Sequence, residues 1–411
     1  MMKYLQIIVD ELKGDKVIWA ITIFLSLLSI LVVYSATGSL AYKSYGGDTE
    51  YFLIKHSLLV VISLIATYLC HNIHYKYYSR LSRIALIISV PLLLIAWQFG
   101  TTLNQASRWI TIPLLKYSFQ PSDLAKLALI ANLASMLSKR QLSIHEFERA
   151  IMPVIIWCGI ICGLIGVSDW STASLLFMTC LLLMFIGRVP IQNIIMLIVV
   201  GVIAGMFAFT FGQRGQTVRS RLAAYTDATH VPFQVEQSYI AIATGGILGK
   251  GIGQSTQRNF LPHPYSDFVF AIIVEEYGTI FASFIIFLYL VFLYRSILIV
   301  ARTERAFGGL LAAGLAFSIV VQAFVHIGVS IGLLPVTGLP LPLLSMGGTS
   351  LIFTGMSIGI ILSVSRSDEE FNQDGNNNSL QRFINRFKQQ KSNEPKMKVK
   401  RSNTPISNSA S

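Results

Sequence analysis

Three carboxylates stand beside or inside one apolar run of the chain. The stretch "LPHPYSDFVFAIIVEEYG" covers residues 261–278; Asp267 comes just before the run, and Glu275 and Glu276 lie within it. A carboxylate at the polar mouth of an apolar helix can act as a general base toward a hydroxyl group, although a helix N-cap would also explain it. The two glutamates would lie about 12 Å deeper along a helix, so we expect each to pair with a cation on a neighbouring helix.

Two further segments place ionisable side chains in apolar surroundings. In "QPSDLAKLAL", Asp123 and Lys126 are three residues apart and share one helix face, where they can form an ion pair. Asp169, in "GVSDWSTASLL", occupies a position where a carboxylate can cap a helix N-terminus. Ionisable groups cost about 2.5–3.5 kcal/mol each at the centre of a membrane helix, so they often mark function. Ion pairing and capping remain the alternative explanations.

The composition indicates that these groups sit in a membrane. Of 411 residues, 53% are hydrophobic and 13% are charged, whereas soluble domains have about a quarter charged residues. Apolar runs of about 20 residues recur along the chain, each long enough to cross a bilayer as a helix. We therefore predict an all-α polytopic membrane protein with about ten transmembrane helices. Their predicted ranges are 17–36, 54–71, 82–99, 119–138, 150–167, 169–187, 192–212, 267–294, 307–331 and 345–365.

Lysine and arginine are concentrated in alternate loops, and this pattern sets the predicted orientation. By the positive-inside rule both termini are cytoplasmic. We interpret 1–16 as a retained cytoplasmic N-terminal segment, 17–365 as the membrane domain and 366–411 as a disordered basic cytoplasmic tail. The net charge of +12 follows this topology, so we expect no nucleic-acid partner.

Two segments between the predicted helices are irregular. One large extracytoplasmic loop, 213–266, joins the seventh and eighth helices, and we expect it to fold against the membrane surface. The prolines and glycines of "LPVTGLPLPLLSMGGTSLI" predict a non-helical segment that closes over a cavity from outside.

The cysteines all lie in apolar runs. Cys158 and Cys162 are one helical turn apart, which would suit a metal or a redox pair, but no histidine or third cysteine is near them in sequence. We therefore interpret the cysteines as apolar filler. The four are Cys70, Cys158, Cys162 and Cys180.

Four motifs occur in a fixed order along about residues 17–365: "SRWI", "FQPSDLAKLAL", "QSYIAIATGGILGKGIGQSTQRNFLPHPYSDFVFAIIVEEYG" and "GLLPVTGLPLPLLSMGGTS". In these motifs the chain resembles the SEDS family of bacterial shape, elongation, division and sporulation proteins, which includes FtsW and RodA. The resemblance implies a peptidoglycan glycosyltransferase that polymerises lipid II, an undecaprenyl-pyrophosphate-linked disaccharide-peptide, at the outer face of the cytoplasmic membrane. It also implies a class B penicillin-binding protein transpeptidase and other division or elongation proteins as partners.

Several site residues follow from the same resemblance. Asp267, in "YSDF", matches the family's catalytic aspartate, and Asp123 and Lys126 match an acidic residue and a lysine of its polar cavity. Asp169 matches the aspartate of the family's "PDxGT" motif, and Arg108 matches the arginine of its "GARRW"-like motif. The chain departs from the family's pattern around Asp169, at Tyr265 and Ser266, and at His326, where asparagine is common.

The implied reaction joins a sugar hydroxyl to an anomeric carbon that carries a lipid diphosphate, with inversion. It needs a general base, which we assign to Asp267, and positive charge on the leaving diphosphate. A divalent cation, Mg²⁺ or Mn²⁺, held by Asp123 and Asp169 with substrate phosphate is a further hypothesis. The substrate-binding candidates are Arg108, Asp123, Lys126, Asp169, Arg214, Arg219, Arg221, Gln237 and Lys250.

Other functions fit part of the pattern. A lipid II flippase would also need intramembrane charges, and a scaffold would only recruit a transpeptidase. The sequence favours the FtsW branch, and hence the division septum of a bacterial inner membrane, over a RodA-type elongation polymerase. The basic tail and "LLSMGGTS" favour division, and "VHIGVSIGLLPVTG" favours elongation.

Overall fold

The structure is a computed structural model that describes residues 13–44, 49–103, 106–112, 117–211, 225, 232–261 and 263–368. Each of the ten predicted spans is a helix in it, with ends that differ from the predictions by several residues. The bounds are α2 Lys16–Ser44, α3 Thr49–Asn72, α4 Tyr78–Phe99, α5 Pro121–Lys139, α6 Met152–Ser168, α7 Trp170–Ile186, α8 Ile191–Phe211, α11 Val269–Arg302, α12 Ala306–Ser330 and a final helix, Thr349–Asp368.

Hydropathy supports a multi-pass membrane protein. Within the described ranges, seven helices are long and apolar enough to cross a bilayer, and α7 and α8 are shorter apolar helices. The helix α5 has a polar first turn that contains Asp123 and, one turn on, Lys126. These helices belong to one unit, Met1–Asp368. The predictions for 1–12 and for most of the tail from 366 onward lie outside the described residues.

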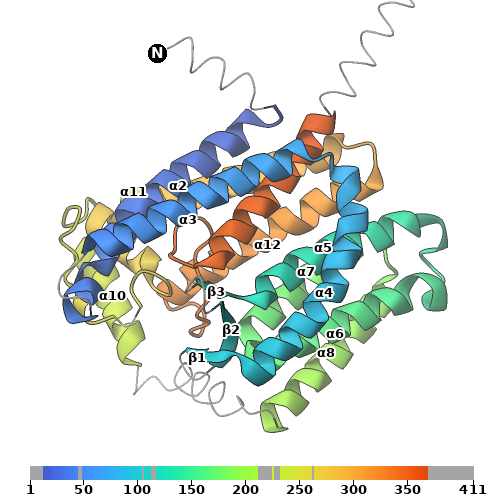
Figure 1. The fold of residues 1–411 in the computed structure, drawn as a ribbon, viewed down its shortest axis with the longest axis horizontal. Helices are drawn as coiled ribbons and strands as arrows, with labels where there is room; N and C mark the ends of the chain where they lie inside the picture. Colours follow the sequence, from blue (N-terminus) through green and yellow to red (C-terminus); the bar gives the residue numbers. More distant parts are fainter. Residues whose placement is uncertain are drawn as a thin grey trace, which may run out of the picture. The chain divides into compact units, whose positions relative to one another are not determined.

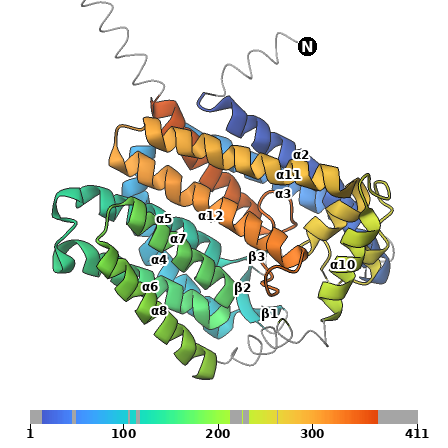
Figure 2. The ribbon, with the colours of Figure 1, turned by 180° about the vertical axis from the view of Figure 1, so that it is seen from behind.

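The helix α12 lies at the centre of the bundle. It packs against α5, α7 and α11, and most of its length is buried (Figures 1 and 2). Small residues allow this close packing: a methyl group added at Gly314 would lie 2.7 Å from Ile130 Cγ2 on α5. The helices α2 and α3 pack against each other, and α2 also contacts α11.

A break at Gly278 divides α11 into two helices. Gly278 has φ 83° and ψ 171°, a conformation that is almost restricted to glycine. A methyl group added there would lie 2.3 Å from Ile247 O, because the backbone of the preceding loop passes directly against it. Residues 269–277 therefore form a short buried helix, and 279–302 form the spanning segment. Glu275 and Glu276 belong to the short helix.

The connecting segments hold the remaining elements. The short helix α10, Phe233–Gly245, packs against α11 within the predicted large loop. Between α4 and α5 the chain forms a small antiparallel sheet in the order β1-β2-β3, which the all-α prediction did not include. The strands are β1 Thr101–Leu103, β2 Ala106–Ile112 and β3 Tyr117–Phe119. The segment 331–348 contains neither helix nor strand, in agreement with its proline-rich sequence.

Candidate active site

A polar cavity of about 170 Å³ lies where α5, α7 and the final helix begin. Segments that are far apart in sequence surround it, including β2, α12 and the irregular segment 331–348. The loop charges predict that this end of the bundle faces outside. The lining residues are Trp109, Gln120, Asp123, Lys126, Asp169, Thr172, Ser266, Gln322, Gly338, Leu339, Pro340, Met346, Gly347, Gly348 and Ser350.

Three helix N-termini meet at this cavity. The helix α5 begins with Pro121, whose fixed φ suits the first helical position, and Asp123 lies in its first turn. Asp169 caps α7, and Thr349 begins the final helix. Each N-terminus carries about half a positive charge, which stabilises negative charge between the helices, including that of the Asp123 and Asp169 carboxylates.

Lys126 is held toward the cavity from α12. Its Nζ donates to Gln322 Oε1 at 3.1 Å, and Gln322 Nε2 donates to Pro340 O at 2.8 Å. The ion pair with Asp123, one of the alternatives that the sequence left open, does not form: Asp123 instead accepts a long hydrogen bond, 3.5 Å, from Thr349 Oγ1. The two side chains share a helix face, but Gln322 lies closer to the ammonium group than Asp123 does.

The Asp169 carboxylate is both a helix cap and part of the cavity. It accepts from Thr172 N at 3.3 Å and from Thr172 Oγ1 at 2.8 Å. The side chain is 4% exposed and lines the cavity together with Asp123, which is 5% exposed. The structure thus brings Asp123, Lys126 and Asp169 together in the lining of one cavity.

Asp267 lies beside the cavity in a turn that precedes α11. The prediction that it begins the helix is wrong: α11 starts at Val269, and Asp267 N donates to His263 O in a turn. Its Oδ1 accepts from Ser266 Oγ at 2.9 Å, and a methyl group added at Gly338 would lie 3.7 Å from its Oδ2. Since Ser266 and Gly338 line the cavity, the carboxylate is adjacent to it and half-buried.

Hydrogen bonds fasten the segment 331–348 over this turn. Met346 N donates to Tyr265 O at 3.0 Å, and Ser345 Oγ donates to Ser266 O at 2.9 Å. From α12, the ring Nδ1 of the buried His326 hydrogen-bonds with Leu339 O at 2.8 Å. Gly338 has φ 69°, which lets the chain turn close to Asp267. These contacts give the irregular backbone its partners, as burial requires.

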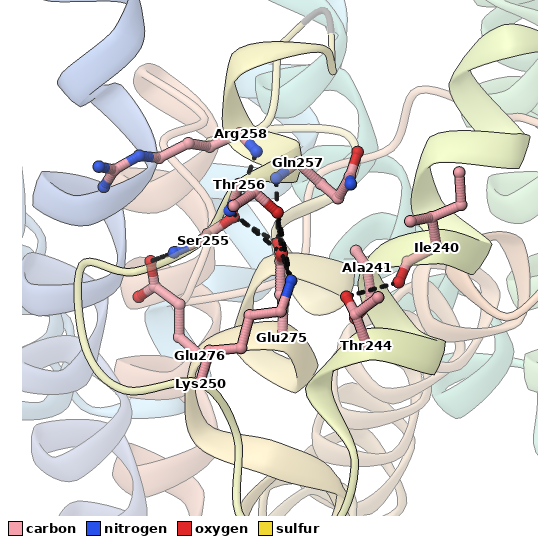
Figure 3. Close-up of polar contacts among 10 residues, drawn as sticks. All are labelled: Ile240, Ala241, Thr244, Lys250, Ser255, Thr256, Gln257, Arg258, Glu275 and Glu276. Atoms are coloured by element: carbon pink, nitrogen blue, oxygen red, sulfur yellow. Dashed lines mark hydrogen bonds and ion pairs between the residues drawn. The ribbon is translucent and has the colours of Figure 1, made fainter.

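Lys250, a predicted substrate ligand, is engaged elsewhere. Its Nζ lies 2.6 Å from Glu275 Oε1, and this buried carboxylate also accepts from Ser255 Oγ and from Thr256 N and Oγ1 (Figure 3). Glu275 pairs with a cation of the loop, whereas we expected one on a neighbouring helix. Lys250 does not line the cavity, so the diphosphate assignment of this residue has no geometric support.

The neighbouring Glu276 points to the other side of the short helix. It accepts from Ser35 Oγ on α2 and from Ser255 N at 3.3 Å. Arg258 donates to the Ser35 carbonyl at 3.0 Å. Within the described ranges, the donors to Glu276 are thus a hydroxyl and an amide where we expected a cation, and the two glutamates join the external loop to α2 and α11.

The remaining predicted ligands are not in the cavity or are not described. Arg214, Arg219 and Arg221 lie outside the described residues. Arg108 lies on β2, immediately before the cavity residue Trp109, and its side chain is outside the described part. Gln237 is half-buried on α10 and is not part of the cavity lining.

Gln322 and Trp109 are cavity residues that the sequence analysis missed. Gln322 is a buried polar residue in the apolar stretch "SIVVQAFVHIG", so the rule that drew attention to Asp123 would also have identified it. Trp109 belongs to the motif "SRWI", in which only the arginine was considered. Its ring lies near the backbone of Gly348.

The cavity offers few ligands for a cation. Asp123 and Asp169 provide two carboxylates, which fit an ion that also binds substrate phosphate oxygens. In the described part of the chain, the one group of three or more potential metal ligands is formed by Cys158, Cys162 and Cys180, away from this cavity.

Comparison with known proteins places these features in a family. Residues 15–370 match the family model FtsW/RodA/SpoVE, described as "cell cycle protein". Stage V sporulation protein E of Bacillus subtilis (strain 168) is 34% identical over 362 residues, covering 86% of this chain and 97% of that protein. A probable peptidoglycan glycosyltransferase FtsW of Geobacter sp. (strain M18) is 32% identical over 356 residues, covering 85% and 96%.

Solved structures share the fold. A chain of a peptidoglycan synthase complex, studied for the structural coordination of polymerization and crosslinking, has a TM-score of 0.68 and 24% identity, covering 86% of this chain and 98% of that one. The rod shape determining protein RodA of Thermus thermophilus has a TM-score of 0.61 and 24% identity, covering 86% and 97%. With the family model matching most of its length, this chain belongs to the FtsW/RodA/SpoVE family.

Proposed function

We propose that this chain is a peptidoglycan glycosyltransferase that polymerises lipid II at the outer face of the bacterial cytoplasmic membrane. The observation that carries the proposal is the cavity in which Asp123, Lys126 and Asp169 meet beside Asp267. The family membership, and the glycosyltransferase names of several relatives, support this reaction over other membrane chemistry.

The leaving diphosphate would occupy the cavity. The positive ends of α5, α7 and the final helix, with the Lys126 ammonium, favour the negative charge that develops on it. Gln322 fixes the lysine, so little reorganisation is needed during the reaction. Asp123 and Asp169 would hold Mg²⁺ or Mn²⁺ against the diphosphate, which would offset their own charge.

Asp267 would act as the general base. The acceptor hydroxyl loses its proton to the carboxylate as its oxygen attacks the anomeric carbon, and the bond from that carbon to the diphosphate oxygen breaks. One displacement inverts the anomeric centre, so no covalent enzyme intermediate is required. The turn 263–268 and Gly338 place the carboxylate next to the cavity and not within it, as an acceptor site beside a diphosphate site requires.

We further infer the cellular role from the names of several relatives. Several relatives above 30% identity are called FtsW, which supports the division branch and a septal location over a RodA-type elongation role. The synthase complex among the structural neighbours supports a transpeptidase partner of the class B penicillin-binding type.

Polymerisation of lipid II by the purified full-length chain, with and without that partner, tests the proposal. Asp267→Asn keeps the shape and removes the base, so the rate should fall by about 10²–10⁴-fold. Glu236→Gln is the matched control, because it removes an exposed carboxylate on α10 outside the cavity. A folded Asp267→Asn protein that polymerises at the wild-type rate would refute the base assignment.

The flippase alternative receives less support from the geometry. A second, small pocket of about 10 Å³ extends from Asp123 and Lys126 toward Phe353 and Ser357. That is about enough for one water molecule, so among the described residues this pocket is too small for a sugar headgroup. If the chain is a flippase, a variant that lacks Asp267 should still move lipid II across a vesicle membrane. If it is a polymerase, the same variant should form little glycan product.

A further inference from the structure

Three cysteine thiols gather between α6 and α7, away from the polar cavity. Cys158 and Cys162 lie one turn apart on α6, and Cys180 approaches them from α7. Their sulfur atoms all lie within 4.8 Å of one another, and the Cys158 and Cys162 sulfurs are 4.0 Å apart. The sequence did not suggest this group, because Cys180 is distant from the other two along the chain.

The spacing of the sulfurs matches that of a trigonal metal site. Thiolate–metal bonds are about 2.3 Å long, and three such bonds in a plane separate the sulfurs by about 4.0 Å. The observed separations of 4.0–4.8 Å need only small side-chain movements to reach this geometry.

The donor set selects the metal. Three sulfurs without a nitrogen or oxygen ligand suit a soft ion, and thiolates favour Cu(I). Zn²⁺ prefers four ligands, and the described residues supply three in this group. We propose that Cys158, Cys162 and Cys180 form a binding site for Cu(I) that links α6 to α7.

Binding replaces protons with the ion, because the thiolate and not the thiol is the form of cysteine that binds a metal. At each ligating cysteine the S–H bond breaks, the proton passes to solvent and an S–Cu bond forms. Cys158 and Cys180 are fully buried, while Cys162 is partly exposed on α6.

Anaerobic titration of the reduced, detergent-purified protein with Cu(I), in competition with a chromogenic chelator, tests the site. The wild type should retain one Cu(I) per chain, and X-ray absorption should show three sulfur neighbours at about 2.3 Å. Cys180→Ser should lower the affinity by about a hundredfold or more, since even outer-shell losses cost 10–100-fold. Cys70→Ser is the matched control, a buried cysteine on α3 outside the group, and should bind as the wild type does.

The result does not depend on polymerase activity, which keeps it separate from the proposed function. Thermal unfolding of each variant shows that it is folded. The proposal is overturned if the wild type surrenders all Cu(I) to the chelator, if Cys180→Ser binds as tightly as the wild type, or if Cys70→Ser loses as much affinity.

Discussion

Replacing Lys250, which pairs with Glu275, would show whether this lysine has a structural role or binds the substrate. If the lysine holds the external loop on the short helix of α11, then Lys250→Met should loosen that loop. Glu275 is 0% exposed, and its carboxylate would lose its one cationic donor within 4.0 Å among the described residues. The loop backbone is attached to the short helix at the same place, since Lys250 N and Gly251 N donate to Glu275 O and Glu276 O at 2.9 and 3.0 Å.

The size of the effect depends on the hydrogen bonds that the Glu275 carboxylate keeps in the variant. Breaking a buried ion pair typically costs about 3–5 kcal/mol. Here the lysine side chain is 27% exposed, and Ser255, Thr256 and the amide of Gln257 continue to donate to the carboxylate. We therefore expect a loss of about 2 kcal/mol, which raises the population of the undocked loop about thirtyfold.

Hydrogen exchange of peptides from 246–260 measures this population directly, since exchange through local opening follows the free energy of opening. Exchange in Lys250→Met should be about thirtyfold faster there and unchanged in α12. In the double variant with Glu275→Gln, the two losses should be less than additive, because each removes the same interaction. Lys55→Met removes a cation from the same predicted side and should leave the loop unaffected.

The opposite pattern would contradict this reasoning. Exchange at the wild-type rate in Lys250→Met, together with weaker binding of lipid II, would make Lys250 a substrate ligand and its contact with Glu275 incidental to function.

Three further predictions concern the kink, the lysine support and the cation. Gly278→Ala should lower the temperature of thermal unfolding or prevent folding, because the backbone conformation at this position costs other residues about 1–3 kcal/mol and the added methyl group would lie 2.3 Å from a backbone oxygen. Gly163→Ala is the control and should be tolerated, because the space around the added carbon is open. Gln322→Leu should slow polymerisation about tenfold or more by leaving Lys126 and the Pro340 carbonyl without their partner, and an unchanged rate would remove Lys126 from the reaction. Chelation of divalent ions should reduce the rate, and Asp169→Asn should raise the Mg²⁺ concentration needed for half-maximal rate; a rate that is insensitive to chelators would exclude the cation.

The helices could be predicted because their signal is local. Each apolar run became a helix, and the proline-rich segment became irregular backbone over a cavity, since composition alone decides both outcomes in a membrane. The proximity of Asp123 and Asp169 could also be expected from the sequence, because polar residues at helix ends tend to face the bundle interior.

The rest depends on contacts between distant parts of the chain. The residues around Lys250 in the sequence do not indicate that it pairs with Glu275. Asp123 is only three residues from Lys126, but the side chain that accepts the hydrogen bond from Lys126 is Gln322 on α12. The break at Gly278 is invisible in an uninterrupted apolar pattern, because a glycine in a helix and a glycine at a kink have the same sequence signature. Cys180 joined Cys158 and Cys162 only through the pairing of α6 with α7.

The break at Gly278 also bears on how the chain enters the bilayer during synthesis. The segment 279–302 contains no acidic residue, and at 1.5 Å per residue it is about 35 Å long, enough to cross the hydrocarbon layer by itself. The insertion machinery can therefore accept this segment without transferring Glu275 or Glu276 into lipid. The two acids would reach their final places later, when the translocated loop closes around them.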